Sequence, residues 1–270
     1  MDSLRLTRDN PWPGLESYDE ASAEFFKGRN AEREDLLRLI RRAPLAVLYG
    51  QSGLGKTSLL QAGVFPQLRQ EDLLPVYIRL DFGPDSPTLA TQVRDRLWEA
   101  ACANDGEATP PTADESLWSW LHRRDTEFWS NRNRLLTPML VFDQFEELFT
   151  LGRGAADTRA FLAALACLVE NRPPAALQAA CEHNPALAER YDFRAQHYRI
   201  LFASREDFLP DFEGLRWLMP SIAHPPPAPA ADGRRASATG CDTRRRRPSQ
   251  PRSRRRHRPI RRQRQTKPAR

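Results

Sequence analysis

The stretch of residues 45–57 reads LAVLYGQSGLGKT and carries the strongest structural signal in the sequence. Its first five residues are an apolar run bounded by Pro44 and Gly50, a pattern typical of a strand buried on both faces of a parallel sheet. The next eight residues fit GxxxxGK[ST] and lead into a helical pattern, which is the context in which this motif cradles phosphate groups. The sequence therefore predicts a nucleotide-binding loop made by Gly50, Gln51, Ser52, Gly53, Leu54, Gly55, Lys56, Thr57 and Ser58.

The residue types of this loop suit phosphate chemistry. Glycines allow backbone angles that aim N–H groups at phosphate oxygens, and the start of a helix favours negative charge. We expect Lys56 to reach the β- and γ-phosphates of ATP and Thr57 to ligate Mg²⁺.

A second motif, MLVFDQFEELF, covers residues 139–149. Its apolar run predicts a strand neighbouring the loop's own strand, with Asp143 at the C-terminal end, where it can hold Mg²⁺ together with Thr57. In many ATPases of this kind a catalytic Glu directly follows this Asp, but here the position is Gln144. We therefore expect Glu146 to orient or deprotonate the attacking water, with Glu147 as the reserve. For either acid the alternative is a solvated first helical turn.

A third motif ends in Arg205, after the apolar run of residues 198–202. A cation at the tip of a strand beside the nucleotide-binding loop can stabilise the charge of a γ-phosphate. Arg205 is thus a candidate sensor of the bound nucleotide, although Asp207 could instead pair with it.

Apolar runs alternate with helical patterns along the chain. The runs cover residues 45–49, 76–80, 139–142 and 198–202, and the helical patterns cover 31–42, 56–69, 88–103, 115–130 and 157–171, with a helical insertion at 174–196. This alternation predicts an α/β fold in which helices sandwich a parallel sheet.

Four segments resemble a known family. They are FFKGRNAERE (25–34), GQSGLGKTSLLQAGVFPQL (50–68), LVFDQFEELF (140–149) and ILFASREDFLPDF (200–212). Roughly residues 10–220 resemble the novel STAND-type NTPases, bacterial signal-transduction ATPases related to NACHT and AAA+ proteins. The resemblance implies a P-loop domain of the ASCE or AAA+ type that is bound to ADP at rest and opens on exchange for ATP. It also implies full-length proteins that often carry WD40 or TPR repeats and can form homo-oligomers.

The same resemblance implies roles for individual residues. Phe26, Gly28 and Arg29 would lie near the adenine and ribose, Lys56 and Thr57 would form the Walker A pair, Asp143 and Glu146 the Walker B pair, and Arg205 the sensor.

Residues 221–270 differ in composition from the rest of the chain. They hold 15 Arg and one Lys against two Asp, and their only large apolar side chains are Ile222 and Ile260. Such a segment buries too little apolar surface to offset its ordering entropy, so we expect a disordered basic tail after an NTPase domain at residues 1–220.

Proteins of the family that this chain resembles continue past this point into a fifth strand and a lid, so we hypothesise that a frameshift near Ser221 truncated a longer protein. In the sheet order that the resemblance implies, the missing strand covers residues 45–49, so truncation would leave these residues as an apolar sheet edge open to aggregation. It predicts an incomplete sheet, weak ATP binding and slow or absent hydrolysis.

Two other functions stay open on sequence grounds. The Arg clusters of the tail could bind RNA or DNA by charge alone, since no aromatic residues are interleaved for base stacking. A P-loop kinase of small molecules is the second, although the acids that trail Asp143 argue against it. No guanine-reading NKxD motif is present, which favours ATP over GTP.

The cysteines and the amino end indicate the compartment. The four cysteines lie far apart without a CxxC pair, which gives no support for a disulfide framework or a zinc site. The first residues contain no apolar signal region, and no apolar run reaches the roughly 18 residues needed to cross a bilayer. We expect a cytoplasmic protein with no membrane partner.

Overall fold

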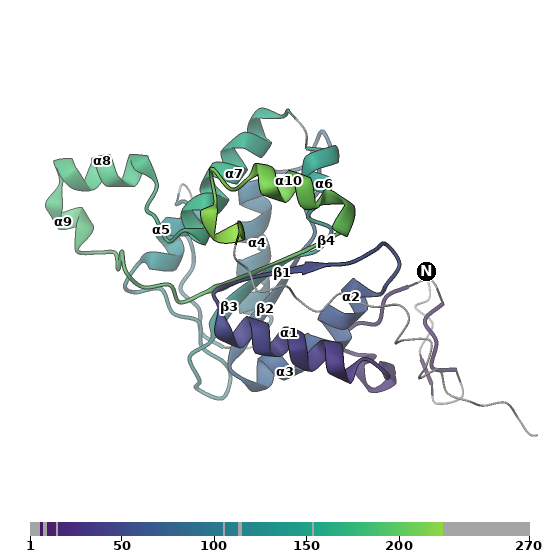
Figure 1. Cartoon of the computed structure of the whole chain (residues 1–270). Helices are drawn as coiled ribbons and strands as arrows, with labels where there is room; N and C mark the ends of the chain where they lie inside the picture. The colour runs from purple at the N-terminus through teal and green to yellow at the C-terminus, as the bar shows by residue number, and fades with distance from the viewer. Residues whose placement is uncertain are drawn as a thin grey trace, which may run out of the picture. The chain divides into compact units, whose positions relative to one another are not determined.

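Four parallel strands form the centre of the chain (Figure 1). The computed structural model describes residues 6–223, apart from 8, 9, 15, 105, 113, 114 and 153. The strands are β1 (Leu45–Tyr49), β2 (Leu73–Ile78), β3 (Thr137–Phe142) and β4 (Arg199–Ser204), and they lie in the order β1-β4-β3-β2. All three strand pairs are parallel, as the sequence predicts.

The strand order corrects one expectation. The strand that leads to Asp143 is β3, and it does not neighbour β1, because β4 lies between them and pairs with both. The strand that leads to Arg205 is β4, and it does lie beside β1. Within the described residues β1 is an edge strand of the sheet.

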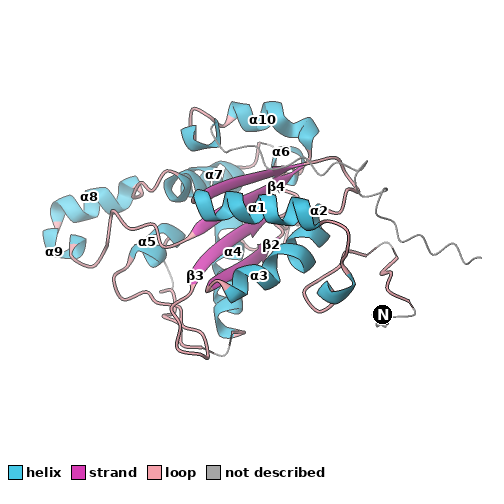
Figure 2. Cartoon of the chain, turned by 60° about the horizontal axis from the view of Figure 1, so that its bottom comes forward, coloured by secondary structure: helices cyan, strands magenta, loops and turns pink. Residues whose placement is uncertain are grey.

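One face of the sheet is covered by the helices that flank the glycine-rich loop, residues 50–57. These helices are α1 (Asn30–Arg42), α2 (Lys56–Ser58) and α3 (Phe65–Gln70), together with the π-helical turn η2 (Leu59–Val64). The predicted stripe of Leu36, Leu37 and Ile40 on α1 is buried here, against alternate residues of the strands such as Ala46 and Leu48. Figure 2 shows α1 and α3 in front of the strands on this face.

The opposite face carries a second and larger apolar core. It is covered by α4 (Leu89–Cys102), α5 (Leu117–His122), α6 (Glu147–Thr150), α7 (Ala156–Val169) and α10 (Leu209–Gly214). Leu45 and Val47 of β1 point into this core, whereas their neighbours Ala46 and Leu48 point into the first, as the two-residue period of a strand requires. The sandwich of two helical layers around a parallel sheet confirms the predicted α/β fold.

The helix after the glycine-rich loop runs without a break from Lys56 to Gln70, but it widens in the middle. In η2 the N–H of Phe65 bonds to the carbonyl of Leu60, one residue further back than in an α-helix. Pro66 follows directly, and a proline has no N–H to donate and crowds the carbonyl four residues before it. The wide turn accommodates this residue without ending the helix.

Two elements differ from the sequence prediction. The run assigned to 76–80 forms a strand at 73–78, because Pro75 is tolerated inside β2, an edge strand. The helix expected over 115–130 ends at His122, and Phe128 and Trp129 form isolated antiparallel bridges with Ala108 and Leu135.

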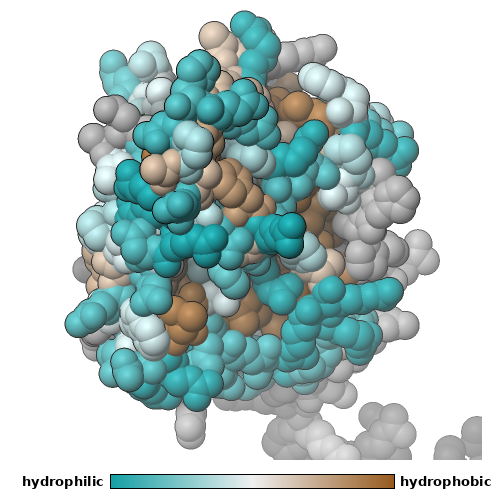
Figure 3. Space-filling view, turned by 90° about the vertical axis from the view of Figure 1, so that its left-hand side faces the viewer, coloured by the Kyte–Doolittle hydropathy of each residue, from teal (hydrophilic) through white to brown (hydrophobic). Residues whose placement is uncertain are grey.

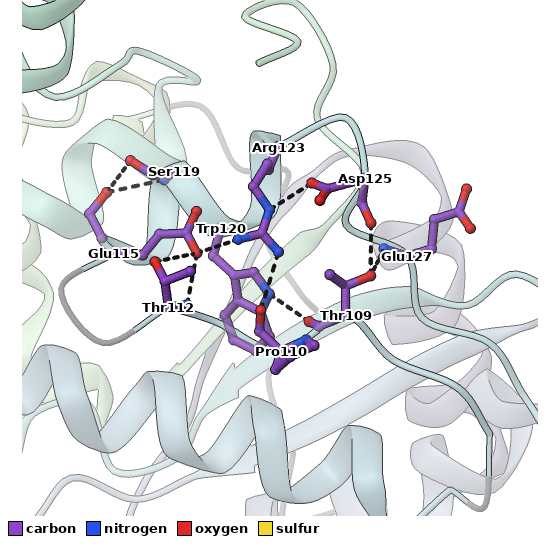
Figure 4. A network of polar contacts seen from close by, with 10 residues as sticks. Thr109, Pro110, Thr112, Glu115, Ser119, Trp120, Arg123, Asp125 and Glu127 are labelled. Carbon is purple, nitrogen blue, oxygen red and sulfur yellow. Dashed lines mark hydrogen bonds and ion pairs between the residues drawn. The ribbon is translucent and has the colours of Figure 1, made fainter. Parts of the chain in front are cut away.

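An ion-pair network centred on the buried Arg123 holds this non-helical segment (Figure 4). The Arg123 guanidinium donates to Glu115 at 2.8 Å, to Asp125 at 2.6 Å and to the carbonyl of Pro110 at 3.2 Å. The side chains of Arg123 and Glu115 are each only 6% exposed. Continuing the helix past His122 would break these contacts, which is why the helical periodicity of the sequence is overridden here.

The elements after α7 differ in how they are packed. The insertion predicted at 174–196 forms two short helices, α8 (Ala175–His183) and α9 (Pro185–Ala188), neither of which buries a residue. Figure 3 views the side of the molecule that carries them and shows brown hydrophobic patches scattered among teal hydrophilic side chains. In the described part of the chain no helix combines the length and apolar character required to cross a bilayer.

The last described segment packs on the second core. It comprises η3 (Glu206–Phe208), α10 and η4 (Pro220–Ala223), and it buries Phe212, Met219 and Ile222 in the core that contains Leu45 and Val47. Leu45 and Val47 are therefore only 6% and 1% exposed, although β1 is an edge strand. The first residues expected in the tail, 221–223, belong to η4, and the rest of the predicted tail lies outside the described residues.

The Arg123 network generates a stability prediction. We expect Arg123→Ala to lower the free energy of unfolding by about 3–5 kcal/mol, because it leaves the Glu115 carboxylate buried without its cation. Urea denaturation followed by circular dichroism measures this. Arg124→Ala, at an exposed neighbouring position, is the matched control and should change the free energy by less than about 0.5 kcal/mol. Equal effects of the two substitutions would contradict the assignment.

Candidate functional site

The glycine-rich loop, residues 50–57, begins where β1 ends, at the C-terminal edge of the sheet. The N–H of Gly50 donates to the carbonyl of Ser204 at 3.3 Å, which ties the start of the loop to β4. Gly53 and Gly55 have φ angles of +78° and +71°, a left-handed backbone that side chains disfavour. The two glycines thus permit the tight path that leads into α2.

Lys56 lies at the start of α2 and is 9% exposed. Its ammonium donates to the carbonyls of Gly50, at 2.8 Å, and Gln51, at 3.0 Å, so it spans the mouth of the loop. Burial lowers the pKa of Lys56, while the carboxylates of Glu146 and Asp143 act in the opposite direction. Two acidic side chains predicted for the site therefore lie close enough to influence this lysine.

Asp143 follows β3 and is joined directly to the loop. Its Oδ2 atom accepts a hydrogen bond from the Thr57 hydroxyl at 2.6 Å, although the two residues are 86 positions apart in sequence. The carboxylate is buried, and Oδ1 accepts from the N–H of Gln144, whose φ of +53° is unusual for a residue other than glycine. The two residues predicted to hold a metal ion are thus brought together.

Tyr77 of β2 is a site residue that the sequence analysis missed. Its hydroxyl donates to Asp143 Oδ2 at 2.9 Å, alongside Thr57. Burial is the main cause that raises the pKa of Tyr77, and the negative charge of Asp143 raises it further. The phenol therefore keeps the proton that it donates to Asp143. The sequence predicts a strand that ends at Leu80, which keeps Tyr77 away from the C-terminal end of the sheet. β2 instead ends at Ile78, so Tyr77 lies at that end, where the site is.

The two candidate acids after Asp143 occupy different surroundings. Glu146 is 8% exposed, and its Oε2 accepts from the N–H of Arg205 at 3.3 Å, so it faces the ends of β3 and β4. Glu147 instead pairs with Arg79 at 2.9 Å, at a more exposed position. Of the two, Glu146 is thus the one at these strand ends, and its charge acts on Lys56.

Arg205 follows β4 and is paired on its own segment. Its Nε donates to Asp207 Oδ1 at 3.1 Å, and a second guanidinium nitrogen donates to the other carboxylate oxygen. The central carbon of the guanidinium lies 5.7 Å from the centre of the Phe208 ring. This bidentate pairing is the alternative that the sequence left open for Asp207.

The amino-terminal segment contacts the loop from the side of α1. Gly28 has a φ of +90°, and Arg29 donates to the loop carbonyls of Leu54 and Gly55. Phe26 packs against Gly63 in η2, where a Cβ atom would lie 3.0 Å from the ring. The hydroxyl oxygen of Ser58 accepts the N–H of Tyr18 at 3.0 Å. Of the three residues that the resemblance places near a base and ribose, Arg29 thus contacts the backbone of the loop and Phe26 packs on the helix that follows the loop.

The arrangement combines the groups needed to bind a polyanion and a hard cation. Backbone N–H groups of a left-handed loop and a lysine ammonium can bind phosphate oxygens. A hydroxyl and a carboxylate, 2.6 Å apart, supply the oxygen ligands that Mg²⁺ prefers. A buried carboxylate and an arginine stand at the adjacent strand ends.

Comparison with known proteins identifies one family, and the solved structures that match include two distant neighbours. The family model described as novel STAND NTPase 1 matches residues 11–227. The Walker-type ATPase PABY2304 of Pyrococcus abyssi is 16% identical at a TM-score of 0.44, covering 75% of this chain and 52% of that chain. A chain of the HORMA:CdnC:Trip13 complex of E. coli MS115-1 is 15% identical at a TM-score of 0.34, covering 71% of this chain and 60% of that one.

The chain thus spans between half and two thirds of the length of these two neighbours, and its assignment does not depend on them. No curated protein sequence matches the chain.

The contact between Tyr77 and Asp143 generates a prediction. We expect Tyr77→Phe to raise the Mg²⁺ concentration needed for half-maximal nucleotide binding by about three- to ten-fold, since a carboxylate loses one hydrogen bond worth about 1 kcal/mol. Binding measured in EDTA should not change. The control is Tyr198→Phe, which also removes a buried hydroxyl, one bonded to the carbonyl of Leu168. An unchanged Mg²⁺ requirement in Tyr77→Phe would show that the contact has no role in the site.

Proposed function

The chain belongs to the novel STAND NTPase family, and on that basis we propose that its NTPase module is an ATP-binding nucleotide switch of a signalling or defence protein. The module extends over residues 1–220, binds ATP and ADP with Mg²⁺, and hydrolyses ATP slowly. The single observation that carries this proposal is the direct hydrogen bond between Thr57 and Asp143, which joins two distant motifs at the mouth of the glycine-rich loop.

Phosphate binding is assigned to the loop and to Lys56. The main-chain amides between Gly50 and Thr57 would bind the phosphate oxygens at the positive end of the helix that starts at Lys56. The Lys56 ammonium already lies across the loop, on the carbonyls of Gly50 and Gln51, and would reach the β- and γ-phosphates.

Metal binding is assigned to Thr57 and Asp143. The hydroxyl and the carboxylate are hard oxygen donors in mutual contact, which fits Mg²⁺. The ion would neutralise charge on the phosphates. Tyr77 and the N–H of Gln144 hold the two oxygens of Asp143 in place by hydrogen bonds of 2.9 and 3.0 Å.

Activation of the attacking water is assigned to Glu146, and the slow rate of hydrolysis to the ion pair that holds Arg205. Glu146 is buried near Lys56, whereas Glu147 is engaged by Arg79, so Glu146 is the better placed to orient a water molecule. Arg205 is held by Asp207 and would have to leave that carboxylate to contact a γ-phosphate. Breaking a bidentate ion pair opposes that step.

Nucleotide binding by the purified chain tests the proposal directly. We expect Lys56→Ala to weaken ATP and ADP binding by about ten- to hundred-fold, since a charge-assisted hydrogen bond contributes about 1.5–3 kcal/mol. Isothermal titration calorimetry in the presence of Mg²⁺ measures the affinity. Arg38→Ala, which removes an exposed cation from α1, is the control. A folded wild-type chain that binds neither nucleotide at millimolar concentration would refute the proposed function.

Single-turnover hydrolysis separates the two acids. With enzyme in excess over labelled ATP, Glu146→Gln should slow cleavage by about 10²–10⁴-fold while ATP binding is retained, because a positioned base contributes on that order. Glu147→Gln is the matched variant and should stay close to wild type. If Glu147→Gln is the slower of the two, the roles are reversed.

A further inference from the structure

We propose that Arg29 is a positioning residue that sets the direction of two N–H groups of the glycine-rich loop, an inference that rests on the proposed nucleotide binding. The Nη1 atom of Arg29 donates to the carbonyl oxygen of Leu54 at 2.6 Å and to that of Gly55 at 3.3 Å. A side chain from outside the loop thus contacts the backbone of its last turn at two successive peptide units.

Holding these carbonyls fixes the opposite side of the same peptide units. In a planar trans peptide the C=O and the following N–H point in opposite directions. The carbonyl of Leu54 shares its peptide plane with the N–H of Gly55, and the carbonyl of Gly55 shares its plane with the N–H of Lys56. With both carbonyls turned toward Arg29, both N–H groups are turned away from it. Gly55 has a φ of +71°, and a glycine can leave such a conformation easily because it has no Cβ atom. The contact with Arg29 therefore restrains a flexible residue.

The guanidinium is itself fixed from the opposite side. Its Nε donates to Glu32 at 3.3 Å, and the side chains of Arg29 and Glu32 are only 9% and 11% exposed. Two different nitrogens thus serve two partners, one on α1 and one on the loop. Arginine can do this because its donors form a rigid fork, whereas lysine presents a single ammonium.

This geometry differs from a contact with the adenine or ribose. An arginine that recognised the base would present its donors to the ligand, but here Nε and Nη1 both bond to protein acceptors. Nη1 also lies 3.3 Å from where a Cβ on Gly55 would stand, so the side chain is packed against the loop itself. The geometry therefore assigns to Arg29 the role of holding the loop backbone in the shape that binds phosphate.

A comparison of a nucleotide with a probe that lacks the base tests this assignment. The affinities of Mg²⁺-ADP and of inorganic tripolyphosphate are measured by calorimetry for the wild-type chain and for Arg29→Ala, Arg29→Lys and Glu32→Gln. The control is Arg33→Ala, which removes an exposed cation from the same helix. Hydrogen–deuterium exchange of peptides covering residues 50–57 is recorded without ligand, and thermal melting monitors folding.

The expected result is a loss common to both ligands. Arg29→Ala should weaken ADP and tripolyphosphate by the same factor, about ten-fold, and speed exchange in residues 50–57, because the cradle loses a charged donor. Arg29→Lys keeps the charge and one contact, so it should fall between Arg29→Ala and wild type, with a loss of about three-fold. Glu32→Gln should resemble Arg29→Lys, and Arg33→Ala should match wild type.

Other outcomes overturn the inference. A loss of ADP affinity with unchanged tripolyphosphate affinity would mean that Arg29 contacts the base or ribose. A lowered melting temperature with unchanged affinity for both ligands would mean that Arg29 only stabilises the fold. If Arg29→Ala does not fold, Arg29→Lys and Glu32→Gln decide the question by the same readouts. A wild-type chain that binds neither probe refutes the proposed function instead, so the two failures are distinguishable.

Discussion

Because β4 pairs with both β1 and β3, it brings the segments of the site to one edge of the sheet. Parallel strands end at the same edge of a sheet, and each crossover helix returns the chain to the other end. The glycine-rich loop, Asp143 and Arg205 each directly follow a strand, so all of them are delivered to one edge. β4 lies between β1, which leads into the loop, and β3, which leads to Asp143. The hydrogen bond from Thr57 to Asp143 therefore joins the ends of two strands that are not neighbours in the sheet.

The charged groups at this edge already have partners within the protein. Lys56 is held by loop carbonyls, Arg29 by Glu32, and Arg205 by Asp207, while Asp143 accepts from two hydroxyls. Such pairing avoids isolated buried charge, which is costly. In the proposed nucleotide complex, Arg29 behind the loop would keep its partners, whereas Arg205 would have to exchange its own.

The fold and much of the site could be predicted because local patterns coincide with the packing. The apolar run at 45–49 and the stripe on α1 match the observed burial. The order of strands could not be derived from those patterns, since nothing in an apolar run specifies its neighbour. Tyr77 was missed because the apolar run at 76–80 places the end of the strand two residues too late, and the end of α5 was missed because no local pattern shows the ion pairs of Arg123 with Glu115 and Asp125. The pairing of Glu147 with Arg79 is likewise a tertiary contact that no local pattern indicates.

The wide turn between the loop and α3 makes helix length a constraint separate from helix composition. Each residue of an α-helix turns the chain by about 100° around the helix axis. The wide turn η2 contains one extra residue, yet the helix continues through it without a break. Deleting a single codon between Leu59 and Val64 would close the wide turn and leave Pro66 in a regular α-helix, where its ring would crowd the carbonyl four residues earlier, while every residue of the glycine-rich loop stayed the same. Conservative substitutions are thus better tolerated in this stretch than insertions or deletions, and related chains that preserve this architecture are expected to keep its residue count even where their side chains diverge.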